Sequence, residues 1–117
     1  MLVTNNTLIE NPDVFVEGDY YAVLIKTRDL VYEGYKLLTH PLFASIRMNF
    51  GPVRSLILSD EKKPIKENEY SMILIGESIS KYQKLMENRK PDFAHLEDYE
   101  KIDFDLFMQA QRELKII

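Results

Sequence analysis

The chain has 117 residues and a mass of 13.8 kDa, a size that suits one domain rather than two. Its 45% hydrophobic and 29% charged residues are ordinary for a globular protein, and they exclude a disordered chain, a collagen and a disulfide mini-protein. A net charge of −4 argues against a general nucleic-acid binder and against attachment to anionic membranes, because both need a basic surface.

Short β-rich runs alternate along the chain with amphipathic stretches. Runs bounded by Asn, Gly or Pro predict strands, and apolar residues spaced three and four apart predict helices. In chain order the predicted elements are a strand at 2–4, a helical turn at 7–13, a strand at 14–17, a helix at 19–37, an ordered loop at 39–52, a strand at 53–59, a loop at 60–69, a helix at 69–89, a strand at 96–102 and a helix at 104–114. This order predicts an α/β fold, a small single-domain sandwich over residues 1–117 with a mainly parallel sheet flanked by helices.

The helix over 19–37 is the most regular of these elements. Asp19 is a good N-cap, and apolar or small residues recur at helical spacing after it. Gly34 weakens the last turn by about 1 kcal/mol relative to alanine. The helix must end before Pro41, because the residue that precedes a proline resists the helical conformation.

The segment 69–89 has two interpretations. Apolar residues recur across it at helical spacing, and Asn68 is a suitable cap. Residues 70–75 also suit a strand, and Gly76 is an unusual residue inside a helix. We favour one helix that stops before Pro91, and a strand at 70–75 stays the alternative.

The C-terminal part predicts a strand at 96–102 and then a helix at 104–114 with Asp103 as its cap. The segment 92–105 is strongly acidic, with six Asp or Glu residues against Lys101 alone. A solvated face is the expected reason for such a run, and a docking patch for a basic partner is the alternative.

The same periodicities predict a core. Tyr20, Tyr35 and Tyr82 lie on inward stripes and are interpreted as packing residues. Tyr21 and Tyr32 fall off these stripes, and exposed aromatic residues beside a long helix suit the face of a homodimer. The predicted core also contains Leu2, Val14, Val16, Leu24, Val31, Leu38, Leu56, Leu58, Ile79 and Leu106.

Several kinds of chemistry have no residues to support them. The chain has no cysteine, which excludes disulfides, thiol catalysis and thiolate metal sites. Its two histidines are far apart in sequence, and no glycine-rich loop follows the first strand, so we expect neither a metal nor a dinucleotide cofactor. No basic leader or long apolar run is visible, and we therefore expect a cytoplasmic protein without membrane segments.

Ligands of α/β proteins usually bind beyond the carboxyl ends of the strands. The polar residues that follow predicted strands are therefore ligand-binding candidates, although plain turn chemistry is an alternative for the two asparagines. These candidates are Asn5, Asn6, Glu17, Gly18, Ser59, Asp60 and Asp103.

The run Thr39-His40-Pro41, with Ser45 nearby, is the second candidate site. It places a hydroxyl, an imidazole and a rigid proline in one turn. One hypothesis is that the loop folds back to bring His40 close to Asn5. The other is that His40 caps the preceding helix by bonding its last carbonyls.

The segment 28–42, RDLVYEGYKLLTHPL, together with residues 4–6, TNN, resembles the GrdX family. The resemblance extends over about residues 2–106. GrdX proteins are small proteins encoded beside the glycine, sarcosine and betaine reductase genes of amino-acid-fermenting anaerobes. The resemblance implies no established enzyme activity. It implies an accessory or regulatory role near a reductase that uses selenocysteine and thiol chemistry, neither of which this chain carries.

Two functions follow from these observations. The favoured one is a non-catalytic accessory or regulatory protein that binds a small metabolite or a protein partner of the glycine reductase system. The alternative is a small enzyme that acts on an amino-acid-like or acyl substrate, with His40 as general base and Asn5 or Asn6 orienting the substrate.

Overall fold

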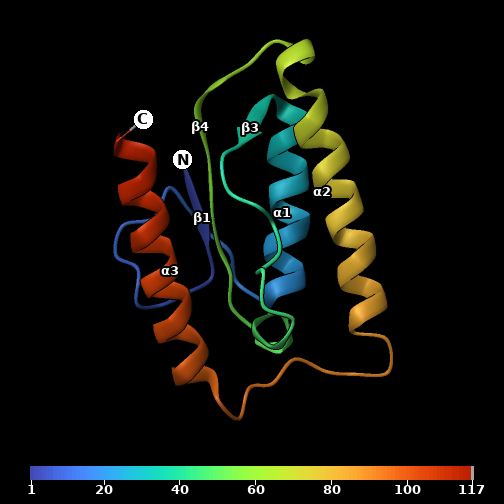
Figure 1. Cartoon of the computed structure of the whole chain (residues 1–117), viewed down its shortest axis with the longest axis vertical. Coiled ribbons are helices and arrows are strands. Elements are labelled where there is room, and N and C mark those ends of the chain that lie inside the picture. Colours follow the sequence, from blue (N-terminus) through green and yellow to red (C-terminus); the bar gives the residue numbers. More distant parts are fainter. Residues whose placement is uncertain (117) are drawn as a thin grey trace.

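The computed structural model of the chain describes residues 1–116, and its elements form a mixed α/β domain (Figure 1). None of the helices within these residues is long and apolar enough to cross a membrane. The elements are β1 (Leu2–Thr4), β2 (Val14–Phe15), α1 (Tyr20–Glu33), β3 (Tyr35–Leu37), the 3-10 helix η1 (Arg47–Phe50), β4 (Ser55–Lys62), α2 (Ile65–Leu85) and α3 (Leu96–Ile116).

The strands form a sheet in the order β2-β1-β4-β3. β1 is parallel to β2, but β4 is antiparallel to both β1 and β3. The α/β class is therefore confirmed, whereas the prediction of a mainly parallel sheet is wrong. The reason lies at Gly34, which has a φ of 121° and ends α1 by donating its N–H to helix carbonyls. The chain turns there directly into β3, whose residues the prediction had assigned to the helix over 19–37. Because this additional strand precedes β4, β4 runs in the opposite direction.

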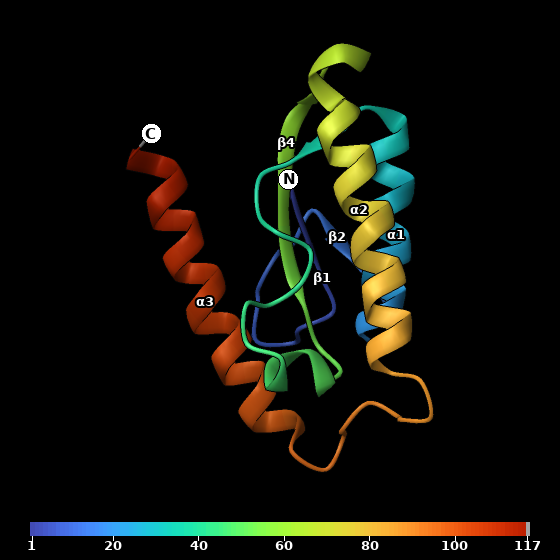
Figure 2. The ribbon, with the colours of Figure 1, turned by 45° about the vertical axis from the view of Figure 1, so that its right-hand side comes forward.

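Helices cover both faces of the sheet. α1 and α2 pack together on one face, and α3 crosses the other (Figure 2). Figure 2 also shows that α3 leans away from the sheet towards its C-terminal end.

The predicted helix at 69–89 is confirmed over the strand alternative, although α2 begins earlier, at Ile65. Residues 7–13 form turns and bends instead of a helical turn, and the loop 39–52 contains η1. The predicted strand at 96–102 is wrong, because these residues are the first turns of α3. Asp103 consequently lies inside α3 and does not cap it.

The core lies mainly between the sheet and the layer formed by α1 and α2. Leu24, Val31, Leu56, Leu58 and Ile79 are buried as predicted, and the less completely buried Val14 and Val16 pack against them. Val3 takes the inward place in β1, and Leu2 is half-buried. The full set of buried core residues is Val3, Tyr20, Val23, Leu24, Leu30, Val31, Leu37, Phe43, Leu56, Leu58, Ile75, Ile79 and Tyr82.

Two predicted core residues are exposed instead. Leu38 is 43% exposed, because side chains alternate in and beyond β3 so that Leu37 points inward. Leu106 is 40% exposed on α3. The prediction placed Leu106 on the inner face of a helix that began at residue 104. The observed helix begins at Leu96, and it buries Phe107 instead.

Candidate functional site

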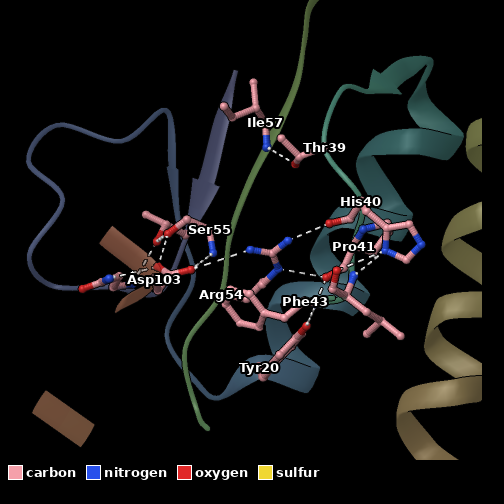
Figure 3. Close-up of polar contacts among 12 residues, drawn as sticks. Tyr20, Thr39, His40, Pro41, Phe43, Arg54, Ser55, Ile57 and Asp103 are labelled. Atoms are coloured by element: carbon pink, nitrogen blue, oxygen red, sulfur yellow. Dashed lines mark hydrogen bonds and ion pairs between the residues drawn. The ribbon is translucent and has the colours of Figure 1, made fainter. Parts of the chain in front are cut away.

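Arg54, the residue before β4, lies between Asp103 of α3 and the loop at His40 and Pro41 (Figure 3). Its Nε donates to the Pro41 carbonyl at 3.0 Å, and its Nη2 donates to the His40 carbonyl at 2.7 Å. The guanidinium carbon lies 4.0 Å from the centre of the Phe43 ring, within the range of a cation–π contact. Two backbone carbonyls and a ring therefore hold the guanidinium in one orientation.

Burial of Arg54 has an electrostatic cost. The residue is only 8% exposed, and burial lowers the pKa of its guanidinium from the usual value, although Tyr20 and Asp103 act in the opposite direction. Arg54 Nη1 is 3.8 Å from Asp103 Oδ1, which is an ion pair but too long for a hydrogen bond. Among the described residues none accepts a hydrogen bond from Nη1, so this nitrogen has donors free for an added anion.

Asp103 on α3 accepts a set of buried hydrogen bonds. Its Oδ1 accepts from the Ser55 backbone N–H at 3.0 Å, and its Oδ2 accepts from Ser55 Oγ at 2.6 Å and Asn6 Nδ2 at 2.9 Å. Ser55 has one hydroxyl proton, so Thr4 Oγ1 is the donor in its 2.7 Å contact with Ser55 Oγ. Neutral donors therefore hold the carboxylate in place, and it faces the Arg54 guanidinium across 3.8 Å without a direct hydrogen bond.

The same network ties α3 to the first loop. Asn6 Nδ2 also donates to the Glu100 backbone carbonyl at 2.9 Å, and Thr7 Oγ1 donates to Glu100 Oε2 at 2.7 Å. Both acceptors lie in the N-terminal half of α3. Polar contacts therefore fix this half of the helix, in agreement with the lean of its C-terminal half in Figure 2.

A second polar group shapes the loop that holds Arg54. Tyr20 Oη donates to Asn49 Oδ1 at 2.7 Å, and the same oxygen of Asn49 accepts the Phe43 backbone N–H at 2.9 Å. Asn49 Nδ2 returns hydrogen bonds to the Phe43 and Ser45 carbonyls. Burial raises the pKa of Tyr20 well above its usual value, so the phenol stays a neutral donor.

A cavity of about 350 Å³ opens beside Arg54, between the loop after β3, the start of β4 and α3. This volume is within the range of small-molecule sites. Its polar lining comes from Thr39, Ser45, Arg54 and Ser55, and the rest of the wall is apolar. The arrangement is suited to a small ligand that carries an anionic group and an apolar body.

Two residues of the second predicted site, Thr39 and Ser45, line the cavity, whereas His40 is not part of its lining. Thr39 Oγ1 accepts the Ile57 backbone N–H at 3.1 Å and lines the cavity with Ser45. His40 is exposed, and its Nδ1 accepts the Leu42 backbone N–H at 3.0 Å. The helix-cap hypothesis for His40 is wrong, because β3 separates it from the end of α1.

Asn5 and the loop at His40 meet through Arg54. Asn5 Oδ1 accepts the Arg54 backbone N–H at 3.0 Å, while the Arg54 side chain binds the His40 carbonyl. Asn5 Nδ2 donates to the Gly18 and Pro52 carbonyls at 2.9 and 2.8 Å. The side chain of Asn5 is therefore engaged in holding three chain segments together.

The remaining candidates at strand ends lie away from the cavity. Glu17 is exposed. Ser59 Oγ donates to the Glu61 carbonyl and accepts the Lys36 backbone N–H. Asp60 pairs with the N-terminal amine at 2.6 Å, and this contact lowers the pKa of its carboxyl.

His95 forms an exposed pair with Asp92, whose Oδ2 lies 2.8 Å from His95 Nδ1. The hydrogen bond raises the pKa of His95 and lowers that of Asp92. Within residues 1–116 no group of three or more His, Asp or Glu side chains is arranged to hold a metal ion.

We expect an NMR titration to give His95 a midpoint above 6.5, and Asp92→Asn to return it towards that value. The sign follows from the two pKa shifts: the pair stabilises the fold between the lowered pKa of Asp92 and pH 6.5, and this contribution is lost as the pH rises through the folded-state pKa of His95 or falls through that of Asp92. An unchanged His95 midpoint in Asp92→Asn would show that the pair is absent in solution.

Sequence reasoning missed Arg54 and Asn49. Arg54 did leave a signal, since it is a charged residue inside the apolar run 53–59. A charge at such a place is rarely buried without a partner or a function. No local pattern marks Asn49, because its role in shaping the loop depends on a hydrogen bond from Tyr20, which is distant in sequence.

Comparison with known proteins identifies the family. The family model described as GrdX-like protein matches residues 1–112, nearly the whole chain. The chain therefore belongs to the GrdX-like family. Neither the curated proteins nor the solved structures contain a match to it.

Proposed function

We propose that this GrdX-like chain is a non-catalytic accessory or regulatory protein that binds a small carboxylate-bearing metabolite at Arg54. The observation that carries the proposal is a buried arginine that lines a cavity of about 350 Å³ and whose Nη1 is paired with Asp103 at 3.8 Å without a direct hydrogen bond. A buried cation gains most from an anion that replaces its lost hydration. Arginine also matches the planar geometry of a carboxylate.

The resemblance to proteins encoded with glycine, sarcosine and betaine reductases supports the choice of ligand. All three amino-acid substrates are small zwitterions, in which one methylene joins a carboxylate to an ammonium group. Their carboxylate would accept a hydrogen bond from Arg54 Nη1. Thr39 and Ser45, which carry hydroxyl groups, line the same cavity. We propose that the chain senses or delivers such a metabolite in the cytoplasm, next to a protein partner of that reductase system.

Binding is favoured over the enzyme alternative because of His40. A general base must reach the proton that it removes. His40 Nδ1 accepts a backbone N–H, and the ring is absent from the described lining of the cavity. A homodimer through exposed aromatic residues stays a separate proposal, for which Tyr32, 60% exposed, is the best-placed residue.

Calorimetric titration of the protein with glycine, sarcosine and betaine tests the proposal. Saturable binding of at least one is expected, with a loss of about tenfold or more in Arg54→Met, because hydrogen bonds to charged groups contribute about 1.5–3 kcal/mol. Arg54→Lys keeps the charge but loses the planar fork, and should fall between the two. Arg47→Met, at an exposed position of η1, is the matched control and should bind like the wild type.

Circular dichroism establishes that each variant is folded before titration. Equal affinity in folded Arg54→Met, or absence of binding to all three compounds in the wild type, would contradict the proposal.

A further inference from the structure

A second, larger cavity adjoins the one at Arg54. It has a volume of about 750 Å³ and lies between β1, β4 and the C-terminal half of α3. Ile57 and Phe107 line both cavities, so these two side chains form a wall that the cavities share. The C-terminal half of α3, which lines this cavity, is the part of the helix that leans away from the sheet (Figure 2).

The walls of the larger cavity are mostly apolar. α3 contributes Phe104, Met108 and Leu114, and the facing wall includes Leu8 and Leu38. These two leucines are 45% and 43% exposed, although most leucines of a folded protein are buried. Acidic groups, such as Asp60 paired with the N-terminal amine, lie at the rim.

We propose that the ligand is an amphipathic carboxylate with an unbranched aliphatic chain, of the fatty-acid class. Its carboxylate binds Arg54, and its chain passes Ile57 and Phe107 into the larger cavity. This inference rests on the proposed function, since it extends the ligand held by the same guanidinium. A headgroup alone, of the size of glycine, would leave the leucines of the larger cavity in water.

The charges of the two cavities support one orientation of this ligand. Arg54 lines the smaller cavity, while the lining of the larger one includes Glu10, Asp13 and Asp60 against the cations of Lys115 and the N-terminal amine. An acid that entered with its carboxylate towards Asp60 would meet a like charge. The chain therefore occupies the larger cavity and the carboxylate the smaller one.

A series of straight-chain carboxylates from acetate to decanoate, each below its micelle concentration, tests the inference by calorimetry. Affinity should increase by about fourfold for each methylene that enters the cavity. The alcohol 1-octanol, which has the chain but no charge, should bind more weakly than octanoate. Arg54→Met should weaken octanoate and leave 1-octanol unchanged.

Leu38→Glu places a charge in the wall of the larger cavity alone, at an exposed position that the fold tolerates. It should weaken octanoate at least tenfold and leave acetate unchanged. Ile46→Glu, at a position 64% exposed and outside both linings, is the matched control.

The possible outcomes separate the two proposals. Saturable binding of acetate or glycine at Arg54 with no dependence on chain length would overturn this inference and leave the proposed function standing. Failure of every carboxylate to bind would overturn both.

Discussion

Replacing Asp103 with alanine is expected to lower the free energy of unfolding by about 3–5 kcal/mol. Asp103 is fully buried and accepts hydrogen bonds from Ser55 and Asn6. Its removal leaves these donors without an acceptor and leaves Arg54 without its nearest carboxylate. Each unsatisfied buried donor costs about 1–3 kcal/mol, so the loss is large although only one side chain changes.

Chemical denaturation of Asp103→Ala and Asp105→Ala measures this effect. Asp105 is exposed and lies on the same helix two residues later, so its replacement changes the helix propensity and net charge by the same amount. We expect Asp105→Ala to stay within about 0.5 kcal/mol of the wild type. Similar stability of the two variants would show that the buried network contributes little.

Replacing Leu56 with alanine is expected to cost about 2–5 kcal/mol of folding free energy. Leu56 is fully buried in β4, the central strand that pairs with both β1 and β3. The smaller side chain leaves a cavity that the sheet and the helices above it cannot close. Leu24→Ala on α1 should have a similar effect for the same reason.

Leu106→Ala is the matched control for this experiment. Leu106 is 40% exposed, so its truncation removes less buried surface than that of Leu56 and should cost no more than about 1 kcal/mol. Thermal unfolding of both variants by calorimetry measures the difference. An equal loss of stability in Leu106→Ala and Leu56→Ala would contradict the burial of the two residues described above.

The elements that could be predicted from the sequence are those defined by local patterns, such as a helix cap or the spacing of apolar residues. Asp19 accepts the Ala22 backbone N–H as the N-cap of α1, and the apolar period after it gave the helix its correct inward face. The end of that helix was predicted too late, because Gly34 was interpreted only as a residue that weakens the last helical turn. Its actual role is a positive-φ turn into β3, and only the pairing of β3 with β4 decides that.

Asp103 shows the same limit at the candidate site. An aspartate before an apolar periodic run is typical of an N-cap, and the sequence gives no sign that Ser55 lies opposite it. That contact joins residues 48 positions apart. Arg54 was likewise passed over inside a strand, since its partners at residues 40 and 41 come from a loop whose path no local pattern predicts.

A crystal structure of the wild-type protein grown with octanoate tests the central claim most directly. We expect a carboxylate oxygen about 2.7–2.9 Å from Arg54 Nη1, the usual length of such a charge-assisted hydrogen bond. The aliphatic chain should lie between Ile57 and Phe107. Octanoate bound elsewhere, with only water at Arg54 Nη1, would contradict the assignment of Arg54 as the carboxylate-binding residue.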